Sequence, residues 1–163
     1  MIVLKPEPLT KAAFAPFGEV IEVDGAHHYG INQGFAERYH ALARIDTASE
    51  DGTPIISVFI GEPRPLPLEI ELMERHPLSS QAFYPLQERD WLVVVAEGAE
   101  APQSLRAFRA SGRQGVSYAR NVWHHPLLVL DPASRFLIVD RKGPGENLEE
   151  HWFDEGVNIR LEL

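Results

Sequence analysis

Short stretches in which apolar and polar residues alternate recur along the chain. Leu68–Leu72 and Ile159–Leu163 are two of them, and a period of two residues is typical of a strand with one buried face. Trp91–Ala96 is apolar throughout, which predicts a strand buried on both faces. The pattern predicts at least eight strands: Glu19–Val23, Ile55–Ile60, Leu66–Leu72, Trp91–Ala96, Leu105–Ala110, Leu127–Leu130, Phe136–Val139 and Val157–Leu163.

Helix signals are few along the chain, whereas turn signals are many. Thr10 can cap a short helical turn over Lys11–Phe14, and Asp46–Glu50 is a second candidate turn. The 13 prolines and 12 glycines are spread along the chain and separate the apolar stretches. Short strands at this spacing predict an all-β sandwich or small barrel with one or two short helical turns.

The length and composition indicate one globular domain over residues 1–163. No apolar run reaches the roughly 20 residues that cross a membrane, and Lys5, Glu7 and Lys11 interrupt any signal-peptide core. The absence of cysteine excludes disulfides, thiolate metal sites and thiol nucleophiles, and it is compatible with the cytoplasmic location that we expect. A net charge of −9 disfavours nucleic acid and anionic membranes as partners, so we expect a small molecule instead.

Positive charge is concentrated in one window of the chain. Residues 101–130 contain no Asp or Glu, and with four arginines this window carries +4 while the rest of the chain carries −13. If these side chains converge from neighbouring strands, they form a site for a small anion. The alternative is that each arginine lies on a solvated strand face. The four residues are Arg106, Arg109, Arg113 and Arg120.

The densest group of polar rings lies within Tyr118–Pro126, which contains Arg120, Trp123, His124 and His125. Successive strand residues point to opposite faces, so only one of the two histidines can face a barrel interior, with the other outside or at an interface. In a regular strand, Arg120 shares the face of His124. This combination favours a functional role over a purely structural one.

Two further segments place polar side chains at alternating positions. Glu74 and His76 share one face of a continuing strand, where a carboxylate can orient an imidazole or share a metal ion with it. The alternative for this pair is an exposed, salt-bridged strand end. The segment Asn32–His40, with Arg38, is a weaker candidate, because a loop that serves only structure is equally consistent with it.

These segments together resemble the ureidoglycolate lyase family, also called ureidoglycolate hydrolase. The resemblance covers most of the chain and is carried by Asn32-x-Gly34-x-x-x-Arg38-Tyr39-His40, Glu74-Arg75-His76-Pro77-Leu78-x-x-Gln81-Ala82-Phe83-x-Pro85, Leu105-Arg106-Ala107-Phe108 and Gln114-Gly115-Val116-x-Tyr118-x-Arg120-Asn121-Val122-Trp123-His124-His125-Pro126-Leu127. It implies a cupin-like double-stranded β-helix, or jelly-roll barrel. It also implies a homodimer that cleaves (S)-ureidoglycolate to glyoxylate and urea, late in allantoin breakdown.

The cupin pattern, laid over the sequence, indicates candidate metal ligands. Its two motifs fall on Glu74, His76 and Gln81, and on Ala119, Asn121 and His124. Glu74 replaces a histidine of that pattern and the neutral Gln81 replaces a carboxylate, so Glu74, His76, Gln81 and His124 would hold an octahedral divalent ion less tightly than the usual set. The resemblance suggests nickel, and the residues leave a metal-free site open. Asn121 replaces a glycine, and asparagine tolerates left-handed backbone.

The chemistry that the resemblance implies needs an anion clamp, a base and an acid. We expect Arg120, with Arg38, to hold the substrate carboxylate through the planar guanidinium. His124 or His76 takes the hydroxyl proton, and Glu74 orients the ring. The remaining expected substrate contacts are Gln81 and Asn32 at the urea end, and the rings of Tyr118 and Trp123.

Three other functions remain as alternatives at this stage. A hydrolase on the same substrate would release ammonia instead of urea, but it needs a firm metal site. A cupin oxygenase or sugar isomerase would keep the histidine that Glu74 replaces. A non-catalytic cupin would bind a small carboxylate without turnover.

Overall fold

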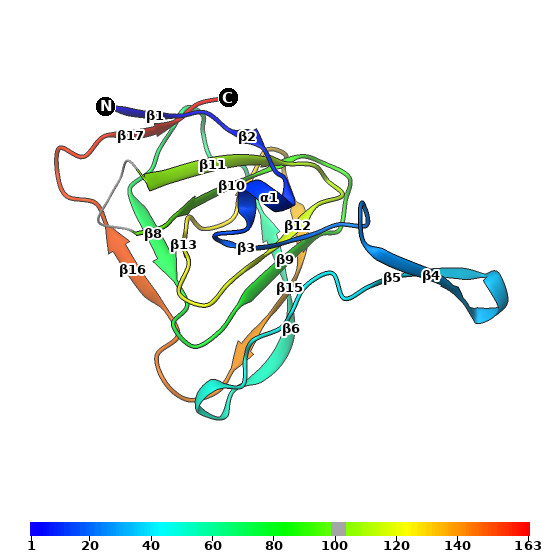
Figure 1. The fold of residues 1–163 in the computed structure, drawn as a ribbon. Coiled ribbons are helices and arrows are strands. Elements are labelled where there is room, and N and C mark those ends of the chain that lie inside the picture. Colours follow the sequence, from blue (N-terminus) through cyan, green and yellow to red (C-terminus); the bar gives the residue numbers. More distant parts are fainter. Residues whose placement is uncertain (99–103) are drawn as a thin grey trace.

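Two large β-sheets contain most of the strand residues in a computed structural model, which describes residues 1–98 and 104–163 (Figure 1). The first sheet has the order β16-β8-β13-β10-β11-β2, with β14 also paired to β10. Its strands are β2 (Glu7–Pro8), β8 (Leu72–Arg75), β10 (Trp91–Ala96), β11 (Leu105–Ala110), β13 (Trp123–His124), β14 (Leu128–Val129) and β16 (Glu149–Trp152). The second has the order β3-β12-β9-β15-β6, formed by β3 (Gly18–Ile21), β6 (Thr53–Gly61), β9 (Gln81–Pro85), β12 (Gly115–Tyr118) and β15 (Ser134–Lys142).

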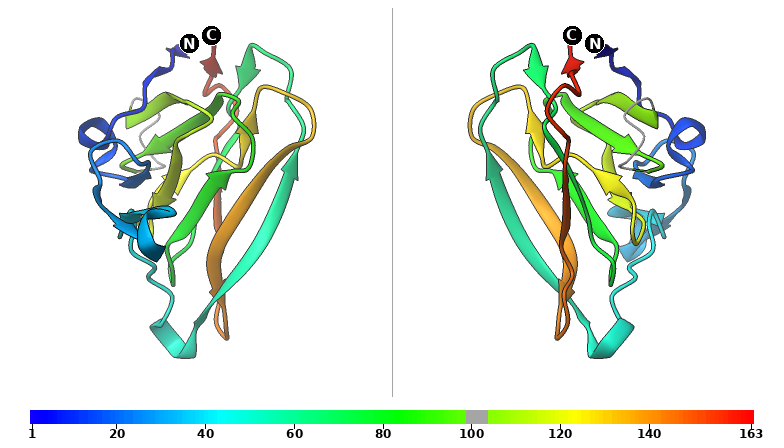
Figure 2. Two further views of the ribbon diagram at one scale, coloured as in Figure 1. Left: turned by 90° about the vertical axis from the view of Figure 1, so that its right-hand side faces the viewer. Right: turned by 90° about the vertical axis from the view of Figure 1, so that its left-hand side faces the viewer.

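Two smaller sheets complete the fold. In the first, β1 (Ile2–Leu4) runs parallel to β17 (Ile159–Leu161), which pairs in turn with β7 (Leu68–Glu69). The two chain ends therefore lie side by side at the top of the molecule (Figures 1 and 2). The second is a hairpin of β4 (His27–Ile31) and β5 (Ala36–His40), closed by the 3-10 turn η1 (Asn32–Gly34), which projects away from the large sheets (Figure 1).

The apolar core has two layers, one on each face of the first large sheet. Trp91, Val93 and Val95 of β10 belong to one layer together with Phe136 and Ile138 of β15 in the second sheet. The alternating residues Leu92, Val94 and Ala96 belong to the other layer, with Ile159 and Leu161 of β17. This confirms that β10 is buried on both faces. The long strands β6 and β15 lie on the side of the molecule opposite α1 (Lys11–Phe14), as Figure 2 shows.

The observed arrangement confirms the prediction of an all-β fold with short helical turns. The helix α1 covers Lys11–Phe14, and the Thr10 hydroxyl accepts a hydrogen bond from the Ala13 amide at 3.1 Å, as expected of its cap. The second predicted turn begins three residues later than expected, as the 3-10 turn η2 (Ser49–Asp51). Among the described residues, no helix is long and apolar enough to cross a membrane.

Several predicted strands are shorter than the sequence pattern suggests. Leu127–Leu130 contains only the two-residue β14. Leu66–Leu72 contains the two-residue β7 and the first residue of β8, because the chain crosses here from the small sheet, where β7 pairs with β17, to the first large sheet, where β8 begins at Leu72. Val157–Leu163 contains only β17. The β4–β5 hairpin and β16 were not predicted, since neither contains a buried residue that would give a hydrophobic period.

We predict that the left-handed backbone at Asn121 (φ 66°) restricts which residues this position accepts. The Asn121 amide donates to the His76 carbonyl at 3.1 Å and so ties the turn before β13 to the end of β8. Asn121→Gly should retain the free energy of unfolding, whereas Asn121→Val should lose about 1–3 kcal/mol. Urea denaturation of both variants measures the difference, and equal stability of the two would contradict the assigned conformation.

Candidate active site

Glu74, His76 and His124 converge on the interior face of the first large sheet. One ligand atom from each lies within 4.8 Å of the others. The antiparallel pairing of β13 with β8 sets His124 opposite Glu74, and the His124 Nε2 lies 3.5 Å from a Glu74 carboxylate oxygen. The rings of His76 and His124 are 5.2 Å apart between centroids. The sequence prediction that Glu74 and His76 share a face is confirmed.

The hydrogen bonds of the two imidazoles fix their tautomers. His76 Nδ1 lies 2.8 Å from the Asn147 carbonyl oxygen, and His124 Nδ1 lies 3.0 Å from the Val122 carbonyl oxygen. A carbonyl oxygen can only accept, so both Nδ1 atoms carry the hydrogen. In the neutral form of each ring, Nε2 then presents a lone pair.

Gln81 adds a fourth acceptor beside this group. Its Nε2 donates to the Asp140 carboxylate at 3.2 Å, which leaves Oε1 free. Within residues 1–98 and 104–163, this Oε1 and the Nε2 atoms of His76 and His124 are buried without any hydrogen-bond partner. A buried polar atom without a partner is costly. Three such acceptors beside the Glu74 carboxylate fit a bound cation, or a ligand that donates hydrogen bonds.

Burial keeps the ionisable groups of this cluster in defined charge states. For His76, burial and then the neighbouring His124 lower the pKa, so its imidazole is neutral at pH 7. For Glu74, burial acts to raise the pKa, but His124 and the other nearby imidazoles outweigh it and the pKa is lowered. Burial raises the pKa of Tyr118, whose neutral ring stacks on His124 with centroids 4.1 Å apart and planes inclined by 7°.

Arg120 lies in the turn before β13, not in a regular strand, so the prediction that it shares a strand face with His124 is wrong. The positive φ of Asn121 breaks the alternation between the two residues. The Arg120 guanidinium is one-third exposed and holds both carboxylate oxygens of Asp46, at 2.7 and 3.2 Å. In this structure the Arg120 guanidinium therefore already binds a carboxylate, that of Asp46.

The other expected substrate contacts lie outside the acceptor cluster. Arg38 and Asn32 are exposed on the projecting β4–β5 hairpin (Figure 1). Trp123 pairs with Ala96 and belongs to the second core layer, on the opposite face of the sheet from His124. Its indole packs under the Arg75 guanidinium, 4.6 Å from the ring centroid.

The arginines of the positively charged window do not converge. Each forms an ion pair with a different carboxylate from outside the window, because strand β2 and nearby loops supply acids where the window has none. The pairs are Arg106–Glu7, Arg109–Asp90, Arg113–Glu88 and Arg120–Asp46.

His125 is buried, with 4% of its surface exposed, although the sequence analysis expected the second histidine outside or at an interface. The second core layer covers the face of the sheet opposite His124, so His125 can lie outside the barrel interior and still be shielded from solvent. Its amide donates to the Val94 carbonyl and its Nδ1 to the Pro126 carbonyl. Burial lowers the pKa of His125 to about 4.

Sequence reasoning missed Asp140 and Asn147, which orient Gln81 and His76. Asp140 follows Phe136 and Ile138 at alternate positions of β15, and both of those side chains are fully buried. A carboxylate that continues an inward-facing apolar stripe is a signal that could have identified it. Asn147 lies in the loop before β16, where the sequence has no comparable period.

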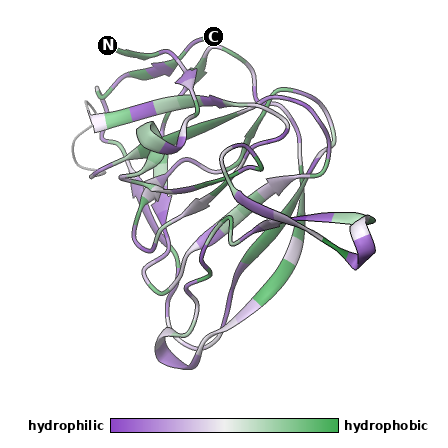
Figure 3. Ribbon diagram, turned by 45° about the vertical axis from the view of Figure 1, so that its right-hand side comes forward, coloured by the Kyte–Doolittle hydropathy of each residue, from purple (hydrophilic) through white to green (hydrophobic). Residues whose placement is uncertain are grey.

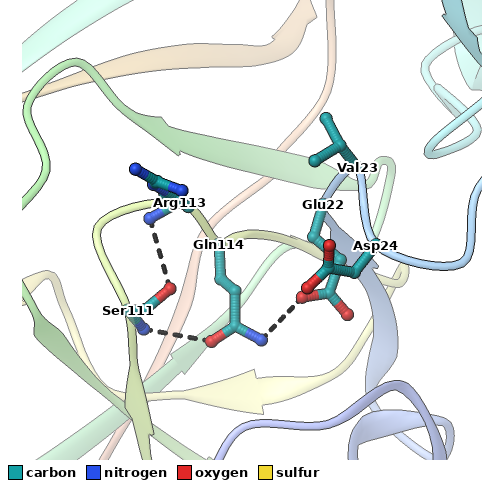
Figure 4. Close-up of a pocket in the computed structure, with 6 residues that line it drawn as sticks. All are labelled: Glu22, Val23, Asp24, Ser111, Arg113 and Gln114. Atoms are coloured by element: carbon teal, nitrogen blue, oxygen red, sulfur yellow. Dashed lines mark hydrogen bonds between the residues drawn. The ribbon is translucent and has the colours of Figure 1, made fainter.

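A surface pocket lies apart from this cluster, where the β11–β12 loop meets the chain after β3 (Figure 4). Its Gln114 accepts from the Ser111 amide at 3.0 Å and donates to the Glu22 carboxylate at 2.8 Å and to the Leu9 carbonyl at 3.0 Å. The Gln114 amide thus joins the backbone at Ser111 and Leu9 to the Glu22 side chain, which is a structural role.

The fold and the cluster define an all-β protein with an interior group of Glu74, His76, His124 and Gln81. Residues 1–160 match the family model described as ureidoglycolate lyase. The chain is 56% identical to "Ureidoglycolate lyase 1" of Rhizobium meliloti, over 96% of this chain and 92% of that protein. It is 52% identical to "Ureidoglycolate lyase" of Pseudomonas syringae pv. tomato, over 99% and 96%. The chain belongs to the ureidoglycolate lyase family.

We predict that His125 makes stability depend on pH. Its pKa is about 4 in the folded chain and about 6.5 when unfolded, so the unfolded state binds more protons as the pH falls below 6.5. The free energy of unfolding should therefore fall by about 2 kcal/mol from pH 7 to pH 5 on account of this residue. Urea denaturation of chelator-treated protein at both pH values measures the loss.

The His125→Gln variant should lack this part of the pH dependence. An identical pH dependence in the native protein and the His125→Gln variant would contradict the prediction.

Proposed function

We propose that this protein is a ureidoglycolate lyase that cleaves (S)-ureidoglycolate to glyoxylate and urea, a late step in allantoin breakdown. The observation that carries the proposal is the buried group of Glu74, His76 and His124 in a chain that belongs to this family. The substrate has a carboxylate beside a carbon that bears both a hydroxyl group and a urea nitrogen. That carbon–nitrogen bond breaks when the hydroxyl loses a proton and the urea nitrogen gains one.

The imidazoles provide the proton transfer in this proposal. The Nε2 lone pair of His124, or that of His76, takes the hydroxyl proton, because each Nδ1 donates to a backbone carbonyl and the two rings converge with Glu74. Glu74, 3.5 Å from His124 Nε2, stabilises the imidazolium that forms. The hydroxyl oxygen becomes the aldehyde oxygen of glyoxylate as the carbon–nitrogen bond breaks, and the proton passes to the departing nitrogen.

A divalent cation, with nickel suggested by the family resemblance, also fits the cluster. Glu74, His76, Gln81 and His124 would hold it, since they supply one carboxylate, two imidazole lone pairs and one amide oxygen. Such an ion would supply positive charge that lowers the pKa of the substrate hydroxyl. In that case the imidazole lone pairs serve as ligands instead of bases, and a chelator distinguishes these two uses.

With one exception, the substrate contacts remain those expected from the sequence. Arg120 would bind the carboxylate, which requires that Asp46 be displaced from the guanidinium. Gln81 lies next to His76 and would contact the urea end in a metal-free site. The other proposed contacts are Arg38, Asn32 and Tyr118, whereas Trp123 lies on the opposite face of the sheet and is not among them.

We also propose a cytoplasmic homodimer. The edge strand β6 supports the dimer, because Ile56, Val58 and Ile60 lie at alternate positions of it and are 71%, 47% and 60% exposed. Part of this long strand is coloured as hydrophobic in Figure 3. An exposed apolar edge strand is normally covered by a partner. The absence of cysteine supports the location, since it suits a reducing compartment.

The identity of the products tests the proposed function. Purified protein receives racemic ureidoglycolate, and glyoxylate, urea and ammonia are followed with and without a strong chelator. We expect equimolar glyoxylate and urea from half of the substrate, and no turnover by the His124→Ala variant. Ammonia in place of urea would assign a hydrolase, and saturable binding without turnover would assign a non-catalytic protein.

A second prediction concerns the carboxylate clamp. Arg120→Lys should lower kcat/KM by about 10- to 100-fold, because a point charge cannot form the two parallel hydrogen bonds of the guanidinium. Arg109→Lys is the matched control, since Arg109 forms a comparable ion pair with Asp90 on the surface. Steady-state kinetics of the two variants decide the matter, and an unchanged value for Arg120→Lys would remove this residue as the clamp.

A further inference from the structure

The amide of Gln81 is held in one orientation by Asp140. Gln81 begins β9, is 6% exposed, and donates from Nε2 to an Asp140 carboxylate oxygen at 3.2 Å. A carboxylate accepts hydrogen bonds and cannot donate them, so it selects the amide nitrogen and turns Oε1 the other way. That oxygen is buried and has no partner in the part of the chain that the structure describes.

Strand register explains why these two side chains meet. β9 and β15 are antiparallel neighbours, with Ala82 opposite Val139. Gln81 and Asp140, the next residue along each strand, therefore lie opposite each other. Both continue inward-facing rows, since Phe83 and Ile138 are buried two residues away on the respective strands. The Gln81 side chain also interacts with the His76 imidazole and acts to raise its pKa. The pair thus links β15 to the acceptor cluster.

The charge of the acceptor cluster indicates a function for the Gln81–Asp140 hydrogen bond. Glu74 is the one carboxylate in the group that converges with His76 and His124. A divalent ion is bound more strongly as nearby negative charge increases. Asp140 places a second carboxylate one hydrogen bond behind the amide oxygen, where it polarises that oxygen without being a ligand.

We propose that Asp140 is a positioning residue for a cation site, and that Gln81 and Asp140 together do what a single carboxylate ligand would do. This inference rests on the cation site of the proposed function. The alternative is that the pair only satisfies two buried polar groups between β9 and β15. That alternative predicts a loss of stability on substitution but no specific effect of charge.

The test is cation binding by chelator-treated protein, measured by calorimetry with Ni²⁺ and with Mn²⁺. Asp140→Asn retains the shape of the side chain and an oxygen that can accept from Gln81, but it removes the charge. We expect its affinity to fall about 10- to 100-fold. Asp90→Asn is the control, because it removes a carboxylate from an exposed ion pair with Arg109 and should bind like the native protein.

A charge exchange makes the test specific. The double variant Gln81→Glu with Asp140→Asn restores the carboxylate, now as a direct ligand, and should recover native affinity to within a few fold. Equal binding by the native protein and Asp140→Asn, or no recovery in the double variant, would overturn the inference. Absence of binding by the native protein itself would instead remove the cation site. Thermal unfolding of each variant checks that the fold is retained.

Discussion

The pairing of β8 with β13 is the contact on which the candidate site depends. Across it, Glu74 stands opposite His124, with His76 following two residues later on the same face. A shift of one residue would turn His124 into the second core layer, where Trp123 now packs. The two strands are short, and their register is secured from outside by the Asn121–His76 backbone hydrogen bond and by β16, which pairs along the whole of β8. The site geometry is therefore set by main-chain hydrogen bonds.

In the described part of the chain, four arginines near the surface are paired, whereas three acceptors of the interior cluster are not. The arginines between residues 105 and 120 are each neutralised by a carboxylate near the surface, so they contribute no positive potential that would oppose a cation inside the barrel. The interior retains acceptors whose partners are missing among the described residues. A polar group is normally buried only when it has a partner, so these acceptors cost stability as long as no ligand engages them.

Local patterns predicted the all-β class, the buried strand β10 and the Thr10 cap, because each depends on residues close together in the sequence. The Glu74–His76 alternation was equally visible. The roles of Arg120 and Trp123 were harder to infer, since one depends on a single left-handed residue, Asn121, and the other on a second core layer that the period of two does not reveal. The ion pairs and the Gln81–Asp140 contact join residues 19 to 99 positions apart, and no local pattern encodes such distances.

The parallel pairing of β1 with β17 couples the two ends of the chain mechanically. Ile2 lies beside Ile159 and Leu4 beside Leu161, and Leu4, Ile159 and Leu161 are buried in the second core layer. Trimming the first four residues would therefore expose β17 and loosen the opposite end of the chain. Any fusion that holds β1 away from β17 would also expose β17. The two ends of the chain therefore stabilise together the second core layer that covers β10.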